Sequence, residues 1–265
     1  MKKHTLFAIV MLMAVHCFAQ APHGHDVSVW MRLNSGVCLT EHYDNGAVPF
    51  TDLGVGLTTG FGTVVEWDQC HAEVDLRVPA SMMLAMGGYN IPIDVRLEFL
   101  YRFYEHPDLP LRLWAGGGLQ SFTDIHYSPA LMNAAMTTSS FLNVMGSGVV
   151  EYDFAPLRGT SHKFLTAHAK LSLPLVGTAR RPGFSYMGNY TSDLNSVNIL
   201  YDGQESFSNC FSGLHTELGL TLNLTNGNRI GVSYRWDYLT TAHRGTYRFD
   251  SAIHSLNLTC LFNLY

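Results

Sequence analysis

The sequence predicts an all-β protein, a transmembrane up-and-down antiparallel β-barrel of about ten strands. The first observation is composition: the 265 residues are 47% hydrophobic and only 14% charged, whereas an average soluble domain has about 25% charged residues. The second is a period-two alternation of apolar residues from residue 26 onward, and the third is a regular alternation of short and long connections. The longest apolar run, 6–15, is too short for a membrane-spanning helix, which excludes a helical membrane protein.

Residues 1–19 have the features of a secretory signal peptide. Lys2 and Lys3 provide the positive start, and Ala19 is the small residue before the predicted cleavage site. Residues 20–25 then form a short periplasmic leader, and 26–265 form the barrel domain.

Ten segments of the barrel domain have one apolar face. In the clearest of them, Val95 and Leu97 alternate with charged residues, as expected for a strand with two different faces. No window of the sequence supports a long amphipathic helix. The predicted strands are approximately 26–34, 53–67, 71–78, 93–104, 109–120, 141–154, 163–175, 211–224, 229–239 and 252–265.

The connections are short after even-numbered segments and long after odd-numbered ones. The last short connection contains Asn226-Gly227, the strongest two-residue hairpin signal. In a soluble β-sandwich there is no reason for short and long connections to alternate along the chain. Membrane barrels, by contrast, have short periplasmic turns and long extracellular loops. The predicted long loops are 35–52, 79–92, 121–140, 176–210 and 240–251.

Aromatic residues on the apolar face lie at the ends of the predicted strands. Amphipathic rings prefer a membrane–water interface, so two such belts indicate that the apolar face contacts lipid. A secreted soluble barrel or sandwich would require these placements to be accidental. The rings are Trp67, Tyr101, Phe103, Tyr152 and Phe154 at the short-turn end, and Trp236 and Tyr238 at the long-loop end.

Charged residues collect on the opposite face of the same segments. A basic residue facing lipid near the bilayer midplane costs about 2–4 kcal/mol, so this face is predicted to line the lumen. The mixed signs indicate pairing within a polar, mostly plugged interior, because ten strands make a narrow barrel. The predicted lumen network is Glu73, Asp75, Arg77, Asp94, Arg96, Glu98, Arg102, Glu151, Asp153, His168, Lys170, His215, Glu217, Arg235 and Asp237.

Glycines also lie on the predicted lumen face. They could leave a path for a small solute, but the interpretation that we favour is that they accommodate large neighbours across the lumen. These glycines are Gly54, Gly56, Gly60, Gly62, Gly116 and Gly118.

The final segment resembles the last strand of bacterial outer-membrane β-barrel proteins. Leu256, Leu258 and Phe262 alternate along it, and Tyr265 matches the terminal aromatic residue of that family, although strict alternation places Leu264 on the apolar register. The resemblance implies the outer membrane of a Gram-negative bacterium, contact with outer-membrane lipid, and recognition by the barrel-assembly machinery through the strand ending in Tyr265. It covers the architecture of the mature chain and identifies no functional family.

The function predicted for such a barrel is structural or surface ligand-binding through long extracellular loops, as a monomer. Loops on a rigid scaffold are common binding sites, and the longest one contains Tyr186, Tyr190, Tyr201 and Asp202 as a candidate ligand site. The sequence does not identify the ligand. The formal net charge of −5 gives no electrostatic reason to bind nucleic acid.

Two alternatives are a narrow, porin-like channel for small solutes and an outer-membrane lipid or peptide hydrolase. His254 and Ser255 are adjacent, so they point to opposite faces of a strand and cannot pair. A protease at the rim would draw on Asp202, His215, Asp237 and His243, which no local motif connects. No catalytic residue is therefore predicted.

Metal and disulfide chemistry have weak signals. His23, His25 and Asp26 could hold a divalent ion, but a flexible polar leader is the preferred interpretation, and no metal or cofactor is predicted. Cys38 and Cys210 either form a disulfide or remain free thiols.

Overall fold

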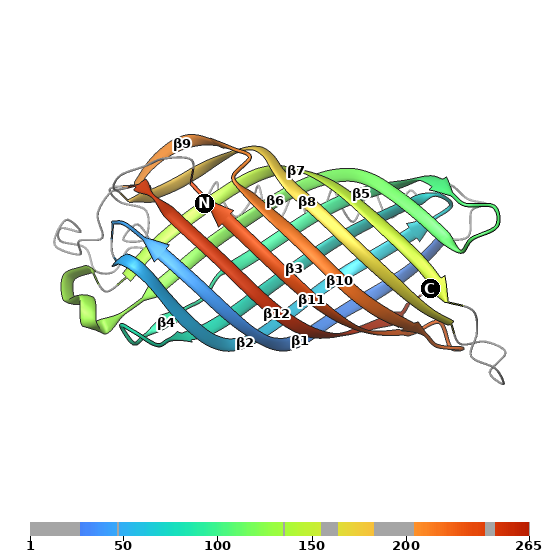
Figure 1. The fold of residues 1–265 in the computed structure, drawn as a ribbon, viewed down its shortest axis with the longest axis horizontal. Coiled ribbons are helices and arrows are strands. Elements are labelled where there is room, and N and C mark those ends of the chain that lie inside the picture. Colours follow the sequence, from blue (N-terminus) through green and yellow to red (C-terminus); the bar gives the residue numbers. More distant parts are fainter. Residues whose placement is uncertain are drawn as a thin grey trace.

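The computed structural model describes residues 27–46, 48–134, 136–154, 164–182, 204–241 and 247–264, which form a closed antiparallel barrel of ten strands (Figure 1). Two short segments share a place in the wall with a longer strand: β4 lies between β3 and β6, as β5 does, and β9 pairs with β8, as β10 does. The elements are β1 Val27–Asp44, β2 Val48–Trp67, β3 Cys70–Met83, β4 Tyr89–Asn90, β5 Ile93–Glu105, β6 Leu111–Tyr127, the 3₁₀ helix η1 Pro129–Ala134, β7 Met136–Phe154, β8 Phe164–Pro182, β9 Gln204–Cys210, β10 Gly213–Asn223, β11 Arg229–Thr240 and β12 Phe249–Asn263.

Successive strands pair as neighbours, and the first and last strands close the cylinder. β1 pairs with β12 from Trp30↔Asn263 to Asp44↔Phe249 and with β2 along its other edge. Closure satisfies backbone hydrogen bonds that lipid could not. The predicted fold class is confirmed. No helix among the described residues is long and apolar enough to cross a membrane.

Side chains alternate between the outer wall and the interior along each strand. In β1, Leu39 is 56% exposed and the next residue, Thr40, is 1% exposed. The rings predicted to form the short-turn belt, such as Tyr101, Phe103 and Phe154, lie exposed on the outer wall. The apolar face is therefore the outer face, as expected when lipid replaces water around a barrel.

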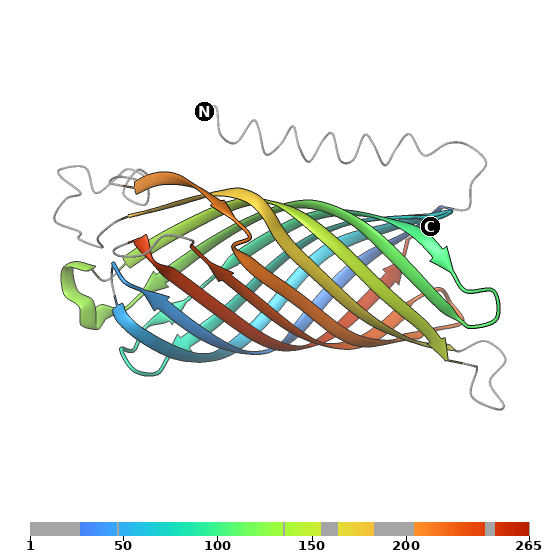
Figure 2. The same ribbon diagram turned by 45° about the horizontal axis from the view of Figure 1, so that its top comes forward.

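The two ends of the barrel differ in their connections. Figure 2 shows η1 and the long hairpins at one end and the short turns at the other, where β12 ends. We call these the outer end and the turn end.

The strands reach much further toward the outer end than the sequence predicted. β1 continues to Asp44 and β2 begins at Val48, so most of the predicted loop 35–52 is strand. The physical reason is that the outward side chains after Leu39 are Glu41 and Tyr43, so the contrast between the two faces disappears while the hydrogen-bonded wall continues. The predicted loops 79–92, 121–140, 176–210 and 240–251 were also too long, because each contains residues of the strands that flank it.

Two of the lumen-facing glycines, Gly56 and Gly118, have a different role from the one that the sequence favoured. A Cβ on Gly56 would lie 1.9 Å from the carbonyl oxygen of Ala80, and one on Gly118 would lie 1.9 Å from that of Leu97. Both carbonyls belong to an adjacent strand rather than to a large side chain across the lumen. The favoured interpretation was therefore wrong at these positions, where glycine permits close approach of neighbouring backbones.

A charge on the outer wall tests the lipid-facing assignment. Leu33 is an exposed outward residue near the middle of the apolar part of β1. We expect Leu33→Arg to lower the free energy of unfolding by about 2–4 kcal/mol, because the guanidinium would face hydrocarbon. Urea titration of the protein refolded into lipid vesicles measures this change.

The matched control is Glu41→Arg, on the same outward face of β1 but beyond its apolar part. Its expected effect is about 0–1 kcal/mol, because charges near the interface remain hydrated. Equal effects of the two arginines would contradict the lipid-facing assignment.

Candidate functional site

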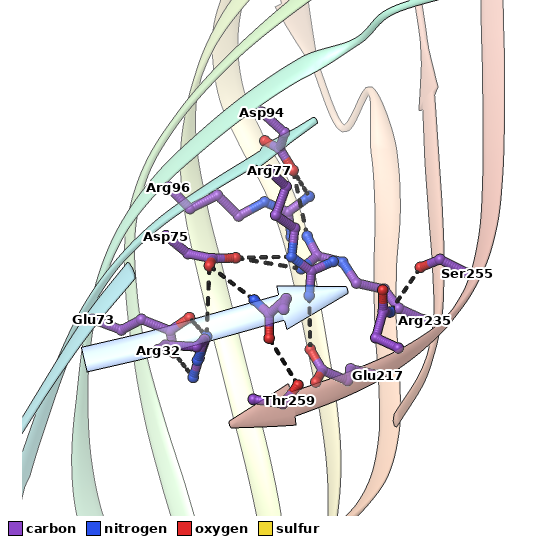
Figure 3. Close-up of polar contacts among 12 residues, drawn as sticks. Arg32, Glu73, Asp75, Arg77, Asp94, Arg96, Glu217, Arg235, Ser255 and Thr259 are labelled. Atoms are coloured by element: carbon purple, nitrogen blue, oxygen red, sulfur yellow. Dashed lines mark hydrogen bonds and ion pairs between the residues drawn. The ribbon is translucent and has the colours of Figure 1, made fainter. Parts of the chain in front are cut away.

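The central part of the lumen contains an ion-pair network that joins opposite walls (Figure 3). Arg235 Nε lies 2.7 Å from Asp237 Oδ2, and Arg235 Nη2 lies 3.4 Å from Asp94 Oδ2. Arg96 Nη2 contacts the same two carboxylates, at 2.7 Å from Asp94 and 3.1 Å from Asp237. Asp75 adds a carboxylate 4.0 Å from Arg235 Nη1. Strands β3, β5 and β11 are thus connected through the interior, although Arg235 and Asp94 are 141 residues apart in the sequence.

Further ion pairs continue this network toward the turn end. Arg32 binds Glu73 through Nη1 and Nη2, and Lys170 pairs with Glu98. Arg77 Nη2 lies 3.8 Å from Glu217, whose other oxygen lies 3.6 Å from His168 Nε2. We call all these ion pairs together the ionic layer. Its residues are Arg32, Glu73, Asp75, Arg77, Asp94, Arg96, Glu98, His168, Lys170, Glu217, Arg235 and Asp237.

A cavity of about 130 Å³ lies between the ionic layer and the turn end. Arg229, which lines it, donates to Glu66 at 3.1 and 2.9 Å and stacks over Trp30 at 4.0 Å. Trp114 donates its Nε1 hydrogen to Glu151 at 2.8 Å. The two cavities found at the ionic layer itself are much smaller, about 20 Å³ each.

An apolar layer crosses the lumen on the outer side of the ionic layer. Phe141 lies 5.3 Å from Phe249 and 6.0 Å from Phe122 between ring centroids, and Leu239 and Ile253 are buried in the same cluster. This layer was not predicted from the sequence. Phe122 and Phe249 fall in segments predicted to be loops, so no strand periodicity marked them as inward-facing.

A group of buried polar side chains lies beyond the apolar layer, at the outer end. The His42 and His126 rings stack at 4.5 Å with a 3° interplanar angle, and Asn90 Nδ2 lies 3.2 Å from His42 Nδ1 and 3.0 Å from Asp124 Oδ1. The outward neighbour of His42 in β1 is Glu41, so this group lies beyond the lipid-facing part of the wall. Burial lowers the pKa of His42 and His126 to about 4 and raises that of Asp124 to about 6.

Three predicted lumen residues lie away from the central network. Arg102 stacks over Trp114 at 5.5 Å and pairs with Glu105 at 3.4 Å, and Asp153 pairs with Arg112 at 2.8 Å, near the turn end. Glu151 accepts the hydrogen bond from Trp114. The predicted surface site at Tyr186, Tyr190, Tyr201 and Asp202 lies outside the described residues, as do the leader, His243 and Tyr265.

The residues considered for a hydrolase contact other parts of the barrel wall or of the ionic layer. His254 lies on the outer wall, where its Nδ1 is 2.7 Å from the Tyr234 hydroxyl, while Ser255 is buried on the other face. His215 Nδ1 lies 2.8 Å from Asp237, but this pair belongs to the ionic layer rather than to the rim.

The two cysteines considered for a disulfide are free. Cys38 is buried in the apolar layer, whereas Cys210 is exposed on β9. The structure thus resolves this alternative in favour of free thiols.

No protein-family model and no curated protein matches the chain. Among solved structures, the chain is similar to the transport unit of the autotransporter AIDA-I from Escherichia coli, with 11% identity, 95% of this chain and 96% of that chain covered, and a TM-score of 0.37. The translocator domain of the autotransporter NalP from Neisseria meningitidis has 10% identity, coverage of 97% and 95%, and a TM-score of 0.34. Neisserial surface protein A has 12% identity, coverage of 86% and 95%, and a TM-score of 0.30. At these identities and TM-scores the likeness concerns the barrel fold alone.

Proposed function

We propose that the chain is an integral outer-membrane protein of a Gram-negative bacterium whose lumen is closed to solutes and whose outer end serves a structural or surface ligand-binding role. The observation that carries the closed lumen is the direct succession of the ionic layer and the apolar layer along the barrel axis. A cavity of about 20 Å³, as found at the ionic layer, holds about one water molecule. A hydrated solute needs a wider, continuous path.

The bonding of the ionic layer also supports closure. Arg235 and Arg96 each contact carboxylates on more than one strand, so no single side chain can swing aside without leaving buried charges unpaired. The apolar layer adds three phenylalanine rings, of which Phe141 contacts both Phe122 and Phe249.

The outer end supports a surface role because it is built largely from strand. β8 and β9 remain paired from Val176↔Cys210 to Pro182↔Gln204, and β6 and β7 remain paired as far as Tyr127↔Met136. Such a wall holds the connecting loops on a rigid base, which favours binding. The proposed ligand site remains Tyr186, Tyr190, Tyr201 and Asp202, in the segment of the chain that connects β8 to β9.

Planar-bilayer recording tests the closed lumen. We expect the purified protein, inserted in the bilayer, to give no conductance above the lipid baseline over the voltage range in which a general porin gives stable steps. The same preparation must show heat-modifiable migration on a gel, which verifies that the barrel is folded. Stable, reproducible conductance steps from folded protein would support the small-solute channel instead.

A further inference from the structure

The short strand β4 is held at the outer end partly by one of its own side chains. It is two residues long and pairs with β3 along one edge and with β6 along the other. Asn90 of β4 adds two contacts through Nδ2, at 3.2 Å from His42 Nδ1 on β1 and at 3.0 Å from Asp124 Oδ1 on β6. His42, Asn90, Asp124 and His126, each at most 1% exposed, are here called the outer polar cluster.

The contact between Asn90 and His42 requires a neutral imidazole. The Asn90 amide nitrogen donates to Asp124, which fixes the orientation of the amide, so His42 Nδ1 has to accept from the same nitrogen. An imidazole nitrogen accepts only while it carries no proton, and both nitrogens of an imidazolium are donors. A proton on His42 Nδ1 would therefore place two donors 3.2 Å apart, and β4 would lose its contact with β1.

The second histidine makes the cluster still less suited to positive charge. The rings of His42 and His126 are parallel, with 4.5 Å between their centroids and a 3° angle between their planes. Both ring nitrogens of His126, and Nε2 of His42, are buried and make no hydrogen bond with the described residues. Two neutral rings can stack in this way, whereas two imidazolium ions would repel each other in a site that excludes water.

The charged groups around the two rings already have partners. Asp44 on β1 pairs with Arg181 on β8, and Asp52 on β2 accepts hydrogen bonds from the backbone nitrogens of residues 85 and 86 at 2.9 and 3.2 Å. From β12, the contact with His42 is the apolar ring of Phe249 at 5.5 Å. A proton taken up by either histidine would thus add a positive charge beside Arg181 without a free carboxylate to balance it.

Asp124 is the remaining carboxyl group, with Oδ2 at 3.5 Å from His42 Nδ1. Burial raises the pKa of Asp124 to about 6, whereas burial lowers the pKa of His42 and of His126 to about 4. Asp124 therefore takes up its proton first as the pH falls, and it is neutral when the histidines become charged.

We propose that the outer polar cluster is an acid-sensitive switch: protonation of His42 and His126 breaks the hold of Asn90, and β4, together with the rest of the segment 84–92, separates from the wall at the outer end. The switch is a local opening of the barrel rather than its unfolding. In the orientation of the proposed function it responds to the pH outside the cell.

The direction of the effect follows from the ordinary pKa values of the groups. The pKa of each histidine lies below its ordinary value of 6.5, so the closed form is fully stable above that pH and loses stability as the pH falls toward 4. Asp124 acts in the opposite sense, because its raised pKa stabilises the closed form in acid and that contribution is lost as the pH rises through 6. Two histidines outweigh one carboxyl group, and the open fraction should rise about 100-fold between about pH 7 and about pH 4.5.

Hydrogen–deuterium exchange of the full chain, folded in detergent micelles, tests this switch. Exchange is measured peptide by peptide across this pH range and corrected for the intrinsic rate at each pH. We expect the protection of residues 84–92 to fall about 100-fold in acid. The turn-end hairpin 224–228 has no ionisable side chain, and its protection should not change.

Two variants show whether the histidines are the cause. His42→Gln/His126→Gln keeps an acceptor for Asn90 that does not titrate, so its segment 84–92 should lose no protection in acid. If the double variant does not fold, His126→Gln alone decides, and its loss should be about tenfold or less. His254→Gln removes an outer-wall ring and should respond as the parent chain does.

Three results would overturn the proposal: unchanged protection of 84–92 in the parent chain, an equal loss in 224–228, or a full acid response in folded His126→Gln. The first would show that acid leaves the cluster closed, the second that acid acts on the whole barrel, and the third that other groups carry the response. Conductance is measured separately at neutral pH, so failure of the switch would leave the closed lumen standing.

Discussion

Arg235→Met is expected to lower the free energy of unfolding by about 3–5 kcal/mol, because it leaves buried carboxylates without their main cation. The Arg235 side chain is almost fully buried and lies within ion-pair distance of Asp75, Asp94 and Asp237. Methionine fills much of the same volume, so the loss reports the charge rather than a cavity. Urea titration of the refolded protein, followed by gel mobility and tryptophan fluorescence, gives this free energy.

Two comparisons show whether unpaired charge is the cause. Arg248→Met removes an exposed arginine that also pairs with an aspartate, Asp250 at 2.8 Å, and we expect a loss of at most about 1 kcal/mol. The double variant Arg235→Met/Asp237→Asn should be more stable than Arg235→Met alone, because one uncompensated carboxylate has been removed. A double variant that is less stable than the single one would show that packing, not charge, dominates at this position.

The wall of the barrel was predictable from the sequence because lipid imposes a strict contrast between the two faces of a strand. Val95 and Leu97 alternate with Arg96 and Glu98, and a shift of one residue would place charges in hydrocarbon. The register of β5 and the inward direction of its charges follow from this cost alone. The outer parts of the strands carried no such signal, because outward Glu41 and inward His42 are both polar.

The contents of the lumen were less predictable because they depend on closure of the barrel. The sequence shows that Arg235 and Asp94 face inward, but only the meeting of β5 and β11 across the interior makes them partners. Phe122 and Phe249 belong to distant segments that were taken for loops, so the apolar layer had no local signature. The stacked pair of His42 and His126 was missed for the same reason, since the two residues come together through the strand order.

Gly118→Ala is expected to prevent folding or to lower the free energy of unfolding by at least about 4 kcal/mol. The new methyl group would lie 1.9 Å from the carbonyl oxygen of Leu97 and 2.9 Å from the Cα of Glu98. Both atoms belong to the backbone of the adjacent strand β5, which cannot rotate away as a side chain can. The pairing of β5 with β6 would have to open locally, in a wall where lipid offers no replacement hydrogen bonds.

Gly148→Ala is the matched control, the same chemical change in the neighbouring strand β7. Its Cβ would meet no atom nearer than the carbonyl oxygen of Trp114 at 3.9 Å, an ordinary contact. We therefore expect normal folding and a gain of about 0.5–1 kcal/mol, because alanine has less freedom than glycine in the unfolded chain. The folded fraction on a cold gel and the unfolding free energy measure both variants. If Gly118→Ala folds as well as Gly148→Ala, the close approach of β5 and β6 is not required, and the lumen glycines would need the explanation that the sequence first favoured.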